Sequence, residues 1–188
     1  MDIEIKKLSP DLLGDFLYFF DNKAFTDNHH FSSCYCYFYH CNHSKEVWKD
    51  RTAQENREAA IKLISKGLMN GFLAYSEGKP IAWCHADLRS NLAELDDLCN
   101  EEDNIYKIGS IVCYVVAPEY RRKGIATKLL KHVISNFKED CYNIIEAYPK
   151  LISEIDSENN HGPLKMYIDN GFVQVGGNQM FAIVRKEI

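Results

Sequence analysis

The sequence lacks the features that would place the chain in a membrane or on a secretory route. No apolar run approaches the roughly 18 to 20 residues that a membrane-spanning helix needs. The first residues, from Met1 to Pro10, do not show the charged-then-apolar layout of a signal peptide. The cysteines number seven, which is odd, and several lie in apolar runs, so a disulfide framework is not expected. We therefore expect a cytoplasmic protein with reduced thiols and no membrane partner.

An excess of basic charge is also absent. Asp and Glu outnumber Lys and Arg by 27 to 22, and the resulting net charge of −5 argues against a nucleic-acid partner held by bulk electrostatics. There is no internal repeat, low-complexity tract or interdomain linker. A chain of 188 residues with 46% apolar content can enclose one continuous core. We expect a single domain over residues 1–188, as a monomer or homodimer.

Strand-like and helix-like segments alternate along the chain. Thr52 and Glu55 have the spacing of a helix capping box, and apolar residues recur at helical spacing from Ile125 to Phe137. The expected strands are residues 3–8, 71–75, 80–88, 108–116, 141–147, 172–175 and 180–184, and the expected helices are residues 9–21, 52–67, 124–137 and 164–170. Residues 25–41 are expected to form a long functional loop, and residues 91–104 a solvated connection.

A turn with the composition of a phosphate-binding site follows the strand that ends at Val116. At a helix start the first backbone N–H groups have no intrahelical partner, and the dipole favours an anion. Gly124 lets the backbone approach a phosphate closely. The turn lacks the Lys-Ser/Thr ending of a P-loop and the three-glycine spacing of a dinucleotide-binding turn, so neither ATP nor NAD is expected. The residues expected to bind a pyrophosphate are Arg121, Arg122, Lys123, Gly124, Ile125, Ala126 and Thr127.

These residues and a later segment resemble the GNAT superfamily of acetyl-CoA-dependent N-acetyltransferases. The family signature, R/Q-x-x-G-x-G/A after a strand ending in V-x-P, is matched from Val116 to Ala126. The segment from Leu164 to Phe172 is similar to the late L-Y-x-x-x-G-F motif of the family. The resemblance implies an α/β (α+β) fold with a mixed, mostly antiparallel sheet of about six to seven strands and about four helices, in the order β-α-α-β-β-β-α-β-α-β-β.

The same resemblance implies an N-acetyltransferase that uses acetyl-CoA as cosubstrate. The acetyl group would pass directly to a primary amine of a small-molecule or peptide acceptor within a ternary complex. Three alternatives stay open: an acyltransferase for a longer acyl-CoA or another acceptor, a catalytically silent acyl-CoA-binding sensor or interaction module of the same fold, and a metal-binding regulatory protein.

The resemblance also implies roles for single residues. Tyr167 matches the family residue that protonates the CoA thiolate, and Glu146 is the candidate general base, acting directly or through water. Asn160 matches the first position of a family pattern that contacts the coenzyme. Backbone N–H groups of the strand are expected to bind the acyl oxygen and the pantetheine, namely those of Tyr114, Val115 and Val116. Structural alternatives are a core aromatic for Tyr167 and an exposed carboxylate at a strand end for Glu146.

Residues 34–43 are unusually rich in Cys, Tyr and His. Their C-x-C and H-x-x-H spacings contain zinc-capable side chains but match no zinc finger or ribbon, so no metal is expected. We expect Tyr35, Tyr37 and His40 to line the acceptor pocket. His85, on a predicted strand, faces either the core or the acceptor. Such rings favour an amine that carries an apolar or aromatic portion.

Overall fold

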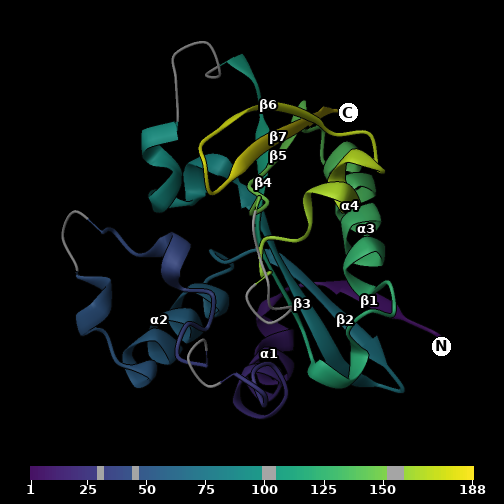
Figure 1. The fold of residues 1–188 in the computed structure, drawn as a ribbon. Coiled ribbons are helices and arrows are strands. Elements are labelled where there is room, and N and C mark those ends of the chain that lie inside the picture. Colours follow the sequence, from purple (N-terminus) through teal and green to yellow (C-terminus); the bar gives the residue numbers. More distant parts are fainter. Residues whose placement is uncertain (29–31, 44–46, 99–104, 152–158) are drawn as a thin grey trace.

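The structure is a computed structural model, and it describes residues 1–28, 32–43, 47–98, 105–151 and 159–188. Within these ranges the chain forms a seven-stranded mixed sheet in the spatial order β1-β2-β3-β4-β5-β7-β6 (Figure 1). The β4–β5 pair is parallel, and the other neighbouring pairs are antiparallel. The strands are β1 (Glu4–Lys7), β2 (Gly71–Ser76), β3 (Lys79–Leu88), β4 (Ile108–Val116), β5 (Ile144–Ala147), β6 (Val173–Gly177) and β7 (Ala182–Glu187).

The described residues also form four α-helices, two on each face of the sheet (Figure 1). Side chains alternate between the two faces of a strand, so neighbouring residues of β3 enter different cores. Trp83 packs with α1 and α2, whereas Cys84 packs with α3 and α4. None of the described helices is both long and apolar enough to cross a membrane. The helices are α1 (Leu13–Asn22), α2 (Ala53–Ser65), α3 (Ile125–Glu139) and α4 (Leu164–Ile168).

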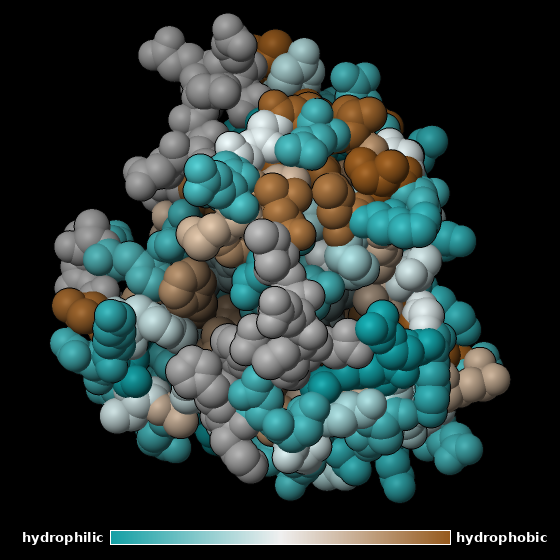
Figure 2. Space-filling model, in the orientation of Figure 1, coloured by the Kyte–Doolittle hydropathy of each residue, from teal (hydrophilic) through white to brown (hydrophobic). Residues whose placement is uncertain are grey.

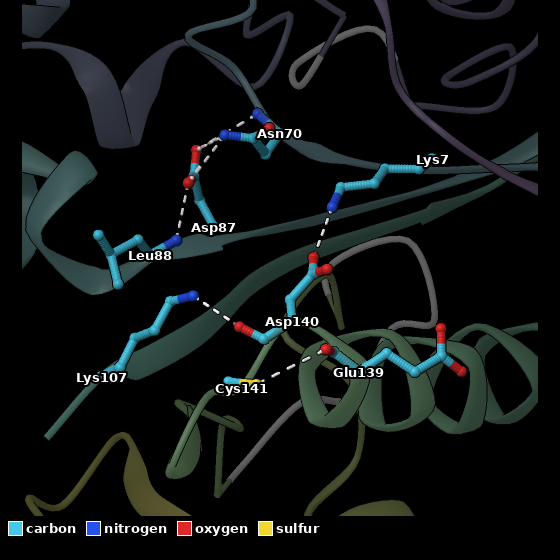
Figure 3. Close-up of polar contacts among 8 residues, drawn as sticks. All are labelled: Lys7, Asn70, Asp87, Leu88, Lys107, Glu139, Asp140 and Cys141. Carbon is cyan, nitrogen blue, oxygen red and sulfur yellow. Dashed lines mark hydrogen bonds and ion pairs between the residues drawn. The ribbon is translucent and has the colours of Figure 1, made fainter.

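Asp140, directly after α3, contacts two parts of the sheet: the edge strand β1 and the residue directly before the central strand β4. Lys7 of β1 forms an ion pair with its carboxylate at 2.7 Å, and the Lys107 ammonium donates to its backbone carbonyl at 2.6 Å (Figure 3). These contacts fix α3 across the strands from β1 to β4, and α3 in turn positions the turn at its other end.

The predicted fold class and order of elements are confirmed. The capping box is present: the Glu55 carboxylate accepts from the Thr52 N–H at 2.7 Å, and the Glu55 N–H donates to the Thr52 hydroxyl at 3.2 Å. The expected solvated connection is wrong for its first part. Residues 89–98 contain 3-10 helices that bury Leu92 and Leu95, because these side chains pack on Val112 of β4.

The two central strands separate partway along their length. β4 and β5 pair as far as Ile111 and Ala147, where β5 ends, but β4 continues to Val116. Since β3 covers the other edge of β4, alternate backbone groups of this extension point into the gap. The separation therefore presents backbone donors and acceptors directly before the turn that leads to α3.

The far edge of the sheet is exposed and apolar. Figure 2 shows apolar side chains gathered over the end of the molecule that carries β6 and β7. Val173, Val175 and Met180 are each more than half exposed there. This edge lies away from the gap between β4 and β5, across two further strands.

Candidate active site

A pocket of about 270 Å³ opens where the extension of β4, the following turn and the segment before α4 meet. Its lining is made by Phe25, Tyr114, Val115, Val116, Tyr120, Arg121, Arg122, Gly124, Ile125, Ala126, Thr127, Asn159, Asn160, Gly162, Pro163 and Met166. With the exception of Lys123, this set contains every residue that the sequence predicted to bind the coenzyme. Lys123 instead holds its ammonium 5.5 Å from the centre of the Tyr120 ring.

Gly124 is the N-cap of α3 and has a left-handed backbone, with φ of 75°. A Cβ at this position would meet no atom within 4 Å, so the glycine faces open space. The N–H groups of the first turn of α3, at Ile125 to Thr127, have no partner within the helix. They lie in the pocket wall, and the positive end of the helix dipole therefore faces the pocket. This combination suits the pyrophosphate of a coenzyme.

Arg121 holds the turn in place. Its Nε donates to the Val116 carbonyl at 3.1 Å, and its two Nη atoms donate to the carboxylate of Asp27 at 2.5 and 3.0 Å. The hydrogen bond from Arg121 lowers the pKa of Asp27, which keeps the pair ionised at neutral pH. The side chain of Arg121 thus connects β4, the turn and the segment after α1.

On the open edge of β4, one backbone donor, the Tyr114 N–H, already has a protein partner. The N–H of Ala117 bonds the Ile81 carbonyl, so by alternation the N–H groups of Val116 and Tyr114 point away from β3. The Tyr114 N–H donates to the backbone carbonyl of Asn160 at 2.5 Å. Of the amides expected to bind the acyl oxygen, this one therefore has a protein partner here, whereas that of Val116 points into the same gap.

Tyr167 lies behind the pocket wall with no exposed surface. Its hydroxyl donates to the backbone carbonyl of His161 at 2.8 Å. Burial raises the pKa of Tyr167 well above its ordinary value, so the hydroxyl is protonated at neutral pH, as a proton donor must be. The accepting carbonyl belongs to His161, the residue directly after Asn160, and Asn160 lines the pocket.

Glu146 lies in a buried ionic cluster on β5. One carboxylate oxygen accepts from the Arg185 Nε at 2.5 Å, and the other accepts from the Tyr148 hydroxyl and faces an Arg89 Nη at 3.5 Å. The side chain is 2% exposed and is not among the residues that line the pocket. Its role as general base stays a prediction, but both of its oxygens already have partners.

The predicted acceptor residues fall into two groups. His40 and His85 meet, with 3.2 Å between their Nε2 atoms, and burial lowers the pKa of both rings, so both are neutral at neutral pH. Tyr35 packs in the core beside α1, and its hydroxyl donates to Asp21 at 2.7 Å. Tyr37 lies under the guanidinium of Arg51, 4.6 Å from it.

Together with Asp87, His40 and His85 form a group whose ligand atoms lie within 4.8 Å of one another. The carboxylate of Asp87 accepts hydrogen bonds from Asn70, the Leu88 N–H and Asn91 (Figure 3 shows the first two). These donors satisfy the carboxylate, and the two imidazoles contact each other through Nε2, whereas the Nδ1 of His85 has no hydrogen-bond partner among the described residues.

Sequence reasoning missed part of the pocket. Phe25, at the start of the expected functional loop, lines the coenzyme pocket and was not among the residues expected there. The segment before α4 contributes Gly162, Pro163 and Met166, and the adjacent Gly-Pro pair was a turn signal that could have marked it.

The sequence profile of the acetyltransferase (GNAT) family matches residues 26–172, which is more than half of the chain. One similar solved structure is the PaiA N-acetyltransferase from Thermoplasma acidophilum in complex with coenzyme A, with 17% identity, full coverage of both chains and a TM-score of 0.57. Another is a GNAT-family acetyltransferase from Listeria monocytogenes, with 13% identity, 99% and 95% coverage and a TM-score of 0.62. A third is the NatC complex bound to Gag peptide and CoA, with 15% identity, coverage of 100% of this chain and 99% of that chain, and a TM-score of 0.57.

A comparison with curated protein sequences found no match. Because the solved structures share so little sequence identity with this chain, their similarity shows the fold alone. The assignment to a family rests on the match to the family profile. The chain therefore belongs to the acetyltransferase (GNAT) family, whose members are acetyl-CoA-dependent N-acetyltransferases.

Proposed function

We propose that the protein binds acetyl-CoA in the pocket between β4 and the start of α3 and transfers the acetyl group to a primary amine. The observation that carries the proposal is the placement of Gly124: its left-handed backbone turns the first amides of α3 into the pocket, and open space takes the place of a side chain. The pyrophosphate would accept from these amides, with Arg122 at the pocket wall adding positive charge.

The pantetheine would lie along the open edge of β4. There the Val116 N–H would donate to it, and the thioester would lie near Tyr114 and Asn160. The amine attacks the thioester carbonyl, the C–S bond breaks, and the CoA thiolate must take up a proton. Tyr167 is the proposed donor, since its protonated hydroxyl lies directly behind this wall.

The acceptor would enter from the face of the sheet that carries α1 and α2. The rings of Tyr39, His40 and His85 meet there, with Tyr39 at 6.3 Å from His85 and His40 at 5.1 Å. Flat rings with polar tips favour a small or peptide-borne amine with an apolar or aromatic portion. The solved NatC complex, which holds a peptide and CoA on a similar fold, supports the peptide-borne form of the acceptor.

A thiol-release assay with acetyl-CoA tests the proposal. The panel contains amino acids, peptides with aromatic and with acidic N-terminal residues, polyamines and aminoglycosides, with propionyl-CoA and a long-chain acyl-CoA as alternative donors. We expect amine-dependent release with acetyl-CoA that is largest for acceptors with an aromatic portion. Tight acetyl-CoA binding without release on any amine would instead support the acyl-CoA sensor.

A further inference from the structure

The segment before α4 holds a buried histidine that points away from the coenzyme pocket. His161 is 9% exposed, and its Nδ1 has no hydrogen-bond partner among the described residues. Asn160 and Gly162, on either side of it, both line the pocket, but His161 does not. Its ring therefore lies on the other side of this segment.

On that side, His161 meets the aromatic region where we place the acceptor. Its ring centre lies 6.3 Å from that of Tyr39 and 5.2 Å from that of Phe181, both in edge-to-face contact. Tyr39 also contacts His85 edge to face, so the rings form a continuous cluster from His161 to the His40–His85 pair. The segment thus lines the coenzyme pocket with Asn160 and Gly162 and contacts this cluster with His161.

The backbone around His161 is firmly held. The carbonyl before it, of Asn160, accepts from the Tyr114 N–H, and its own carbonyl accepts from the Tyr167 hydroxyl. Gly162 has φ of 75°, and a Cβ there would lie 2.8 Å from the Met166 side chain and 3.3 Å from that of Tyr167. Because a side chain at position 162 would clash, the segment packs closely on α4 and its backbone has little room to shift.

We propose that His161 is the general base of the transfer, and that its Nδ1 takes the proton of the acceptor amine. This inference rests on the proposed function. The amine nitrogen forms a bond to the thioester carbonyl carbon, Nδ1 removes a proton from that nitrogen, and the C–S bond then breaks. The thiolate takes a proton from Tyr167 or water, a tyrosinate formed in this way takes up a proton from solvent, and the imidazolium releases its proton to solvent. Glu146, in contrast, has both oxygens occupied by Tyr148 and arginine side chains.

The surroundings of His161 keep its ring neutral. Burial lowers its pKa to about 4, and the positive charge of Lys150 adds to this effect. The phenol of Tyr39, whose pKa is raised by burial, is also neutral. At neutral pH, the tautomer with its proton on Nε2 therefore offers an unshared lone pair on Nδ1. A free alkylamine holds its proton too tightly for such a base, but the nitrogen becomes far more acidic once it is bonded to the carbonyl carbon.

The test compares His161→Asn, His161→Ala and His85→Asn with the wild type. Asparagine retains an acceptor oxygen close to the position of Nδ1 but does not become protonated. For each protein, thermal unfolding reports folding, calorimetry gives the affinity for acetyl-CoA, and thiol release with the best amine gives kcat and KM. Imidazole is added to His161→Ala to restore the missing base in the space that it leaves.

We expect both His161 variants to lose about 10²- to 10⁴-fold in kcat. Their acetyl-CoA affinity should stay within about twofold of the wild type, since the ring lies outside that pocket. Imidazole should restore at least about tenfold of the activity of His161→Ala, an effect that a purely structural role would not produce.

Near-normal kcat in folded His161→Asn, or a loss of kcat only in His85→Asn, would overturn the assignment while leaving the proposed function intact. If the wild type itself acetylates no amine, the proposed function and this inference both fall.

Discussion

The guanidinium of Arg121 donates to both carboxylate oxygens of Asp27, at 2.5 and 3.0 Å, and thereby joins the coenzyme turn to the segment after α1. The same segment places Phe25 in the pocket wall. A turn that must hold its backbone amides toward a phosphate benefits from such a fixed frame, because the amides then need no reordering when the ligand binds.

Arg121→Lys should weaken acetyl-CoA binding about five- to tenfold, because a single ammonium cannot maintain the contacts to Val116 and both oxygens of Asp27. Calorimetry measures the change. Arg57→Lys is the matched control, since Arg57 makes the same kind of paired contact to Asp21 away from the pocket, and it should leave the affinity unchanged. Equal effects of the two variants would show that Arg121 acts on stability alone.

Glu146→Gln should lower the free energy of unfolding by roughly 3 kcal/mol, because it leaves Arg89 and Arg185 without their buried counter-charge. Urea denaturation measures this loss, with the exposed Glu4→Gln as a control. The pH profile of kcat for the folded variant should keep the shape of the wild-type profile. A selective loss of activity at low pH with unchanged stability would instead make Glu146 the base.

Tyr167→Phe should lower kcat by about 10²- to 10⁴-fold with little change in acetyl-CoA affinity, because the hydroxyl is needed only when the thiolate forms. It should also cost about 1 kcal/mol of stability for the lost bond to His161. Tyr75→Phe removes a comparable bond, to Asp15 at 2.8 Å, and should cost stability without lowering kcat. Near-normal turnover in Tyr167→Phe would mean that another group or water protonates CoA.

Protein purified without a histidine tag should contain well below one equivalent of zinc, and a chelator should not shift its Tm. A hydrogen bond to Cys36 and burial raise the pKa of Cys34, while burial raises that of Cys36, so both are neutral thiols and poor metal ligands. Elemental analysis and thermal unfolding check this. One tightly held equivalent, with a Tm that falls on chelation, would contradict it.

Features encoded over a few residues could be predicted from the sequence. The bounds of β4 follow from its apolar, β-branched run, and the start of α3 follows from Gly124 and the apolar stripe after it. The pocket wall formed by the turn was predicted for the same reason, since the geometry of a helix N-terminus is local.

Features that depend on distant partners could not be predicted. Nothing near Glu146 in the sequence shows that two arginines from other elements surround it. Likewise, the residues next to Tyr35 do not show that its ring lies in the core beside α1. The bond from Tyr114 to Asn160 depends likewise on how the segment before α4 crosses β4. Such pairings are set by tertiary packing, which leaves no periodic pattern in the chain.

The central claim is that the turn at Gly124 binds the coenzyme, and calorimetric titration of acetyl-CoA into Gly124→Val tests it most directly. Gly67→Val is the matched control: Gly67 has a similar φ of 66° and equally open surroundings, but it lies at the end of α2, away from the pocket. We expect micromolar-range affinity for the wild type and for Gly67→Val, and at least about 100-fold weaker binding by Gly124→Val. Wild-type affinity in a folded Gly124→Val protein would contradict the account.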